Sequence, residues 1–285
     1  MLKLGCAKRF TLPGKPSMLR GYGFRNQLST GIEDPIEVGV LAISAGGDTV
    51  LCITADLIGI PLAYCNRLYA LLAERFAIPA ERVWLCSSHT HFAPGFDSYF
   101  ITSREGALAY GEHAEDTEYF ESWSQQMLDA TAAALHSREE VTLESVTFEV
   151  PGIAFNRRTR KKLDGKVEMS WTYPDRGEDF QIRPHDSRVH AWRFSTAQGP
   201  KAILACCGCH PVTGYRDAYA ISADYPWYFK QAVERLYGCP GFFLLGAAGD
   251  VVPMLRGSSD IQRSKCPINP RAAMGEILAA TMRLN

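Results

Sequence analysis

Two histidines lie two positions apart in the segment CSSHTHFAPG, at the end of an apolar run. They are His89 and His91. If the extended conformation of the run persists through residue 91, both side chains point to the same side, because side-chain direction alternates along a strand. Two imidazoles placed in this way can share one Zn²⁺, or divide into a metal ligand and a general base. An isolated H-x-H is also compatible with two histidines that merely share a loop.

Two further loops carry residues suited to the same chemistry. GCHP, with His210, follows a second apolar run, and GAAGD, with Gly249 and Asp250, follows a third. A nitrogen from His210 would give a set of three protein ligands, which leaves one position of a tetrahedral zinc for water. The small residues of GAAGD allow backbone N–H groups near Gly249 to approach a developing oxyanion. A tight turn packed against a helix explains them equally well.

Other polar residues near these loops admit simpler explanations. Asp56 follows the run TVLCITA and is a metal ligand, a carboxylate that supports a ligand, or a helix cap. Cys206 and Cys209 have C-x-x-C spacing, but no second pair follows at zinc-ribbon spacing, so we expect packing cysteines. A cysteine nucleophile beside His210, either Cys207 or Cys209, is a further alternative.

The elements that must position these loops follow from the apolar periodicity. The expected strands are 36–44, 49–55, 83–88, 141–150, 188–195, 201–207 and 241–245, with a hairpin turn at 45–48. The expected helices are 62–76, 117–137, 224–237 and 270–282, and SADYP is an N-cap signature for the third of them. This alternation predicts an α/β fold, with a mixed β-sheet flanked by helices and the active-site loops at strand ends.

The segment 157–183 interrupts this pattern, because it is polar and rich in turn residues. We interpret it as an excursion from the domain, and as a mobile lid over the site, and not as a domain boundary. The whole chain, 1–285, is therefore expected to form one catalytic domain.

Composition and charge exclude several classes of protein. The 285 residues include 30 basic and 31 acidic side chains, which gives no footprint for nucleic acid. No apolar run reaches the roughly 20 residues that cross a bilayer, and the first residues lack the apolar core of a signal peptide. The nine cysteines lie mostly in apolar runs, which favours thiols in a reducing compartment. We therefore expect a cytoplasmic protein without membrane insertion.

Eight segments together resemble one family, the neutral/alkaline (non-lysosomal) ceramidases, in their N-terminal catalytic domain and their short bacterial relatives. In family order they are GIEDPIEVGVLAI, TADLIGIP, AIPAERVWLCSSHTHFAPG, FNRR, RPHDSRVHAWRF, CCGCHP, ISADYP and GAAGDVVP. The resemblance implies that His89 and His210 hold a catalytic zinc and that His91 belongs to the catalytic environment. It also implies that Arg157, of the NR motif, contacts the substrate's polar head or the developing oxyanion.

The chain departs from the family pattern at two points. Val252 stands where the family has a serine that is tied to amide cleavage, and a valine can neither attack nor donate a hydrogen bond. The family's glutamate and tyrosine ligands, and its C-terminal immunoglobulin-like domain, come from sequence beyond the GDV loop, which here lies close to the end of the chain. The remaining ligands are then expected among Asp56, Asp250 and His91. An exposed sheet edge left by the missing domain is compatible with a homo-oligomer.

The sequence thus predicts a ceramidase-like zinc-dependent hydrolase that cleaves an amide or related bond in a small polar substrate. Ceramide is not the expected substrate, since no basic amphipathic helix is present to dock on a membrane. In this hypothesis His91 takes or relays a proton, and Arg157 holds a substrate oxygen. The alternative is a non-catalytic relative, with a ligand-binding or structural role, that has lost the ceramidase chemistry.

Overall fold

The computed structural model describes residues 1–96, 114–171, 173, 179–255 and 269–283. The chain divides into two compact units. The first comprises 1–144, 193–202 and 219–223, and the second comprises 145–192, 203–218 and 224–285. The single-domain organisation expected from the sequence stays a prediction.

A five-stranded mixed sheet, of order β5-β4-β3-β1-β6, forms the centre of the first unit. Strands β3 (Glu37–Ala45) and β4 (Asp48–Ala55) form an antiparallel hairpin. Its two central turn residues are glycines with positive φ, as a tight hairpin turn requires. On either side lie β1 (Lys3–Phe10), antiparallel to β3, and β5 (Val83–Ser87), parallel to β4. The outer strand β6 is Glu139–Glu140.

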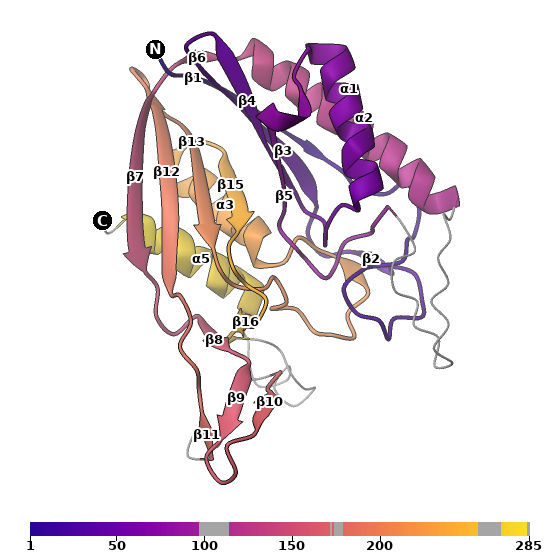
Figure 1. The fold of residues 1–285 in the computed structure, drawn as a ribbon, viewed down its shortest axis with the longest axis vertical. Coiled ribbons are helices and arrows are strands. Elements are labelled where there is room, and N and C mark those ends of the chain that lie inside the picture. The colour runs from indigo at the N-terminus through magenta and orange to yellow at the C-terminus, as the bar shows by residue number, and fades with distance from the viewer. Residues whose placement is uncertain (97–113, 172, 174–178, 256–268, 284–285) are drawn as a thin grey trace. The chain divides into compact units, whose positions relative to one another are not determined.

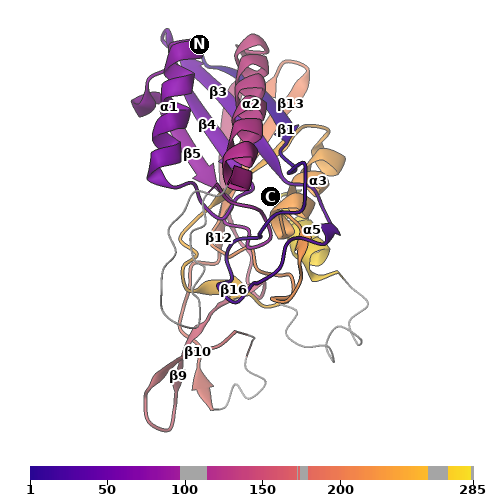
Figure 2. The ribbon, with the colours of Figure 1, turned by 90° about the vertical axis from the view of Figure 1, so that its right-hand side faces the viewer.

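Two helices cover one face of this sheet (Figure 2). Helix α1 (Leu62–Phe76) and the short 3₁₀ helix Ala80–Arg82 connect β4 to β5, and α2 (Ala114–His136) packs on β1 and β3. A Cβ at Gly5 would lie 1.8 Å from the carbonyl oxygen of Ala134, so the backbones of β1 and α2 touch. The short strands β2 (Gly31–Ile32) and β14 (Ala220–Ile221) pair in parallel within the same unit.

A four-stranded sheet has the order β15-β13-β12-β7 (Figure 1). Its strands are β7 (Thr142–Glu149), β12 (Arg188–Thr196), β13 (Gly199–Cys207) and β15 (Gly241–Leu245), with β13 and β15 parallel. In the second unit, helices α3 (Tyr225–Tyr237) and α5 (Pro270–Arg283) pack together. A Cβ at Gly275 would lie 2.5 Å from the backbone nitrogen of Phe229, so this helix crossing requires a glycine.

Two small sheets complete the second unit. Strand β8 (Ala154–Asn156) pairs antiparallel with β16 (Val251–Pro253). Strands β9 (Arg158–Lys161), β10 (Val167–Met169) and β11 (Phe180–Gln181) form a three-stranded sheet of order β10-β9-β11. The predicted excursion 157–183 therefore contains regular structure, although residues 172 and 174–178 lie outside the described part.

The α/β fold with mixed sheet and flanking helices is confirmed. Helix 62–76 has the predicted bounds, and the other predicted helices and long strands are displaced by at most a few residues. The sequence did not predict β1, because KLGCAKRF has no clean alternation of apolar and polar residues. It also did not predict that the strands separate into more than one sheet. Among the described residues, no helix has both the length and the hydropathy that crossing a membrane requires.

Candidate functional site

The loop that carries His89 and His91 begins where β5 ends. The chain continues beside the segment that follows β4: the N–H of Ser88 donates to Ala55 at 2.8 Å, and that of His89 to Leu57 at 2.9 Å. His89 then adopts a left-handed φ of 66°. The condition under which both side chains would point to the same side of a strand, an extended conformation through residue 91, is therefore not met. The two imidazoles nevertheless lie together, with ring centroids 5.1 Å apart at an angle of 82°.

A backbone carbonyl orients the ring of His89. Its Nδ1 lies 2.5 Å from the carbonyl oxygen of Ile58. A carbonyl oxygen only accepts hydrogen bonds, so Nδ1 carries the proton. In the neutral imidazole the lone pair is then on Nε2, which is the arrangement typical of a metal-ligating histidine.

An N-terminal segment to which the sequence motifs assign no role, residues 20–25, packs around His91. A Cβ at Gly21, whose φ is +102°, would lie 2.5 Å from Cγ of His91. The ring of Tyr22 lies 4.8 Å from the imidazole, and Arg25 donates to the carbonyls of Arg20 and His91. Burial lowers the pKa of Arg25 to about 10, so it stays protonated at neutral pH. Alternating glycines and aromatic residues in RGYGF were the available signal for this close approach.

A cavity of about 700 Å³ opens beside the two histidines, within the first unit. Its lining is mainly apolar, with two arginines and no carboxylate among the described lining residues. The lining residues are Met18–Gly23, Arg25, Ile58–Leu62, His89, His91, Gly95 and Phe96. A cavity of this size and polarity suits the apolar portion of a small molecule.

Asp56, the third residue predicted near this loop, makes a structural contact. Its carboxylate accepts the N–H of Glu37 at 3.0 Å and is buried. Helix α1 has Pro61 at its N-cap and no side-chain cap, so the capping explanation for Asp56 was wrong. Its role as a metal ligand stays a prediction.

His210 lies in the second unit, in a loop that approaches the GAAGD loop closely. Its backbone N–H donates to Val251 at 3.0 Å, and its Nδ1 lies 2.7 Å from the carbonyl oxygen of Ala248. By the argument applied to His89, the lone pair of the neutral ring is on Nε2. Cβ atoms at Gly208 or Gly246 would lie 3.1–3.2 Å from the backbone of the other loop, so packing explains why these residues are small.

The pairing of β8 with β16 brings the remaining predicted residues together within the second unit. The backbone N–H of Arg157 donates to Asp250 at 2.7 Å, and its Nη2 donates to Gly249, also at 2.7 Å. Asn156 donates to the Asp250 carboxylate at 3.0 Å. A Cβ at Gly249 would meet nothing within 4 Å, so close packing does not explain this glycine.

Three further residues of this region are buried. Val252 is fully buried in β16, where it pairs with Phe155 of β8. Burial raises the pKa of Cys207 to about 12 and that of Cys209 well above its ordinary value. Both are free thiols. A thiol with so high a pKa is a poor nucleophile at neutral pH, which argues against the cysteine alternative.

Comparison with solved structures identifies the architecture that carries these loops. A neutral ceramidase from Pseudomonas aeruginosa matches with a TM-score of 0.75 and 19% identity over 98% of this chain. This chain has the fold of a neutral ceramidase. A ceramidase complexed with C2 matches equally, with a TM-score of 0.75 and 18% identity over 98% of the chain.

The match concerns part of those proteins. The chain covers 44% of the length of the first ceramidase and 43% of the second. No protein-family model matches the chain, and no curated protein does. The fold thus confirms the resemblance that the eight sequence segments predict. At 18–19% identity, the comparison shows the fold and nothing further.

Proposed function

We propose that this chain is a zinc-dependent hydrolase that cleaves an amide or related bond in a small-molecule substrate. His89 and His210 bind the zinc through Nε2, and His91 either completes the ligand set or relays a proton. The ceramidase fold supports a hydrolase. Zinc, rather than another metal, is the choice that nitrogen ligands favour in a hydrolytic site.

One observation carries the proposal: two histidines from separate loops both bond through Nδ1 to a backbone carbonyl. Such a bond fixes the ring orientation and leaves Nε2 for a metal. Almost every metal-ligating histidine donates its other ring N–H in this way, to a backbone carbonyl, a carboxylate or water. Two histidines with a purely structural role would have no reason to share the same Nδ1 bond to a carbonyl. The motifs HTH and GCHP, which resemble the ceramidase zinc motifs, contain these same two residues.

The other side chains complete the chemistry. A bound zinc supplies a Lewis acid that activates water near neutral pH. His91, whose ring lies 5.1 Å from that of His89, accepts the proton if it is not a ligand. Arg157 binds a substrate oxygen, and its bond to Gly249 fixes the orientation of the guanidinium. Asp250 holds Asn156 and Arg157 in position through hydrogen bonds. Backbone N–H groups near Gly249 stabilise the developing oxyanion.

The proposed substrate class is wider than the small polar substrate that the sequence predicts. The cavity beside His89 and His91 is mainly apolar, so the expectation that excluded ceramide has no support from the structure. An amide with an apolar group of moderate size fits such a cavity. Ceramide belongs among the amides to be tested. Cytoplasmic location and a homo-oligomeric state stay predictions.

Metal analysis of the purified protein tests the proposal. We expect close to one zinc per chain, and we expect His89→Ala and His210→Ala each to abolish it. His190→Ala is the matched control, because this histidine bonds Thr147 on a neighbouring strand. The zinc content of His91→Ala decides between a ligand and a proton relay. Protein that neither retains nor takes up zinc would overturn the assignment, as would variants that keep the wild-type zinc content.

A second candidate function, a non-catalytic binding protein, is favoured by Val252. This residue is fully buried and offers no nucleophile where the family has its serine. A binding protein would be stabilised by ligands of the cavity in the presence of a chelator, without forming a hydrolysis product. Chelator-sensitive release of an amine from any amide substrate would exclude it.

A further inference from the structure

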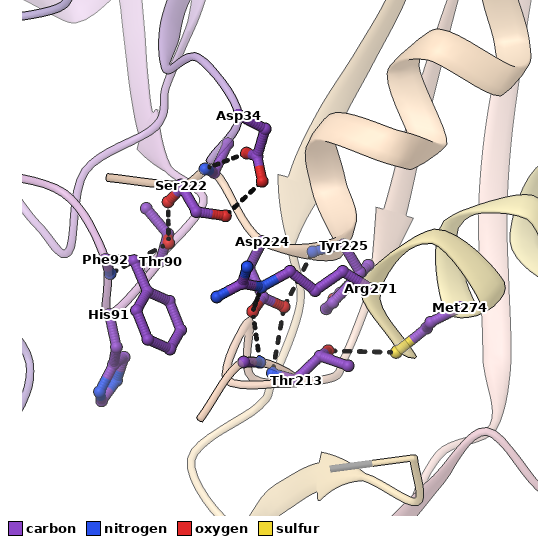
Figure 3. Close-up of polar contacts among 12 residues, drawn as sticks. Asp34, Thr90, His91, Phe92, Thr213, Ser222, Asp224, Tyr225, Arg271 and Met274 are labelled. Atoms are coloured by element: carbon purple, nitrogen blue, oxygen red, sulfur yellow. Dashed lines mark hydrogen bonds and ion pairs between the residues drawn. The ribbon is translucent and has the colours of Figure 1, made fainter. Parts of the chain in front are cut away.

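The segment Ser222–Tyr225 of the ISADYP motif does more than cap a helix. Asp224 does cap α3, as the sequence predicted, by accepting the N–H of Tyr225 at 2.8 Å. The cap uses only one of the many polar contacts that this segment makes (Figure 3). The others reach the loops of the two proposed zinc ligands, through Ser222 in the first unit and through Asp224 in the second.

In the first unit, Ser222 holds the residues on either side of His91. Its carbonyl accepts the hydroxyl of Thr90 at 2.8 Å, and its N–H donates to Phe92 at 2.9 Å. Asp34 fixes Ser222 in turn, because one carboxylate oxygen accepts its hydroxyl at 2.6 Å and the other accepts the N–H of Ala223 at 2.7 Å. Thr90, Ser222 and Asp34 are all buried, so these bonds are shielded from water.

In the second unit, the carboxylate of Asp224 binds the turn that follows His210. One oxygen accepts the N–H of Thr213 at 3.1 Å, in addition to that of Tyr225. The other accepts the N–H of Gly214 at 2.9 Å and Nε of Arg271 at 3.2 Å. Asp224 is completely buried, so these four hydrogen bonds to its two oxygens are shielded from water.

The same segment also holds the residue before His210. The hydroxyl of Tyr225 donates to the carbonyl of Cys209 at 2.6 Å. The consecutive residues Asp224 and Tyr225 thus hold the chain on both sides of His210. Tyr225 bonds Cys209 before it, and Asp224 bonds Thr213 after it. Its own Nδ1 bond to Ala248 orients the ring, whereas these two attachments place its backbone.

The backbone of Asp224 indicates that its carboxylate is needed at this position. Its φ and ψ of 61° and −154° lie in a region that is essentially restricted to glycine. A glycine would relieve the strain and could still begin a helix. It would, however, leave Thr213, Gly214 and the guanidinium of Arg271 without their acceptor.

We propose that Asp224 and Asp34 are positioning residues of the zinc site. Asp224 places His210 through the turn 213–214, and Asp34 places the His89–His91 loop through Ser222. This inference rests on the proposed zinc site, since it concerns the geometry of the ligands. Neither aspartate binds the metal.

The test measures the affinity of Zn²⁺ for Asp224→Asn and Asp224→Gly by competition with a chromophoric chelator. Asparagine keeps the size of the side chain but not its capacity to accept four bonds, and glycine keeps the backbone conformation. We expect both to weaken zinc binding by about tenfold, the lower end of the effect of residues that support ligands. The visible absorption spectrum of the Co²⁺-loaded protein should also change, because it reports coordination geometry.

Asp34→Asn tests the other loop, with the same expected loss and the same change in the Co²⁺ spectrum. Glu276→Gln is the matched control, because its ion pair with Arg235 joins α5 to α3 without touching either histidine loop. Leu278→Ala, a buried residue of α5, controls for lost stability alone. Both control variants should bind zinc as the wild type does.

The outcomes separate the inference from the function on which it rests. Wild-type protein that binds no zinc, or binds it independently of His89 and His210, overturns the proposed function. A histidine-dependent site whose affinity and Co²⁺ spectrum are unchanged in Asp224→Asn, Asp224→Gly and Asp34→Asn overturns only the positioning roles. Equal losses in Leu278→Ala would also overturn them, because a general loss of stability would then explain the effect.

Discussion

The two histidine loops achieve the same side-chain arrangement in different surroundings. His89 and His210 both bond through Nδ1 to a carbonyl, Ile58 in one case and Ala248 in the other. The His89 loop has a left-handed residue, lies beside a cavity and is held by an N-terminal segment without regular structure. The His210 loop is buried, packs glycine against glycine and is attached to two helices through Asp224 and Arg271.

This difference suggests a division of roles. In the proposed zinc site, the His210 loop would provide the fixed ligand, because small residues and a buried ion pair leave it little freedom. The His89 loop would provide the proposed ligand that lies beside the cavity. Strain at His89 is compatible with this, since unusual backbone conformations persist where the surrounding structure enforces them and often where function requires them.

Removal of the buried cation should affect the His210 region most. Arg271→Met removes the cation from a buried ion pair with Asp224, in which both side chains are at most 4% exposed. Loss of one member of a buried pair typically costs about 3–5 kcal/mol, so we expect a decrease of that size in the free energy of unfolding. Urea denaturation in the presence of chelator measures it. A decrease below about 1 kcal/mol would show that the His210 loop is not rigidly supported.

Thiol reactivity compares how open the two regions are. Burial raises the pKa of Cys207 to about 12 from 9.0, so its thiolate fraction at pH 8 is lower by about a thousandfold than that of an ordinary cysteine. Cys65, on α1 near the cavity, is only partly buried, and burial raises its pKa. Alkylation at pH 8 followed by peptide mass spectrometry should label Cys65 first and Cys207 only on unfolding. Early labelling of Cys207 would restore the cysteine nucleophile as an alternative.

The sequence predicted the repetitive part of the molecule and the ligand types. Apolar periodicity gave the helix 62–76 and the strands that end at the two loops, because burial of one face dictates those patterns. The GCHP and GAAGD loops were correctly expected to follow strands. Strand β1, which pairs with β3, was not predicted because its charged residues interrupt the alternation of apolar and polar positions.

The surroundings of the site could not be predicted in the same way. No local pattern indicates that His89 is left-handed, since glycine or asparagine is the usual signal. The packing of Gly21 on His91 joins residues 70 positions apart and depends on a segment without periodicity. The second function of Asp224 was hidden by its cap role, because one carboxylate does both.

Close packing around His91 can be disrupted selectively. Gly21→Ala places a Cβ within 2.5 Å of the imidazole, at a φ of +102° that disfavours alanine. We expect a loss of about 1–3 kcal/mol in unfolding free energy, together with altered binding of ligands in the cavity. Gly59→Ala is the control, because Gly59 lines the same cavity but a Cβ there meets nothing within 4 Å. Equal effects of the two substitutions would contradict a specific role of Gly21.

The smallest expected effect concerns the backbone conformations of the two proposed ligands, His89 and His210. At His89, with its φ of 66°, alanine should be less stable than glycine by about 1–2 kcal/mol, the cost of a left-handed conformation. His210 does not have a positive φ, so His210→Gly should instead be less stable than His210→Ala by about 0.5–1 kcal/mol. Thermal or urea unfolding in chelator removes any contribution of bound metal. If glycine is more stable than alanine at both positions, or less stable at both, backbone strain does not distinguish the two loops. If glycine is more stable only at position 89, the strained backbone lies in the loop beside the cavity.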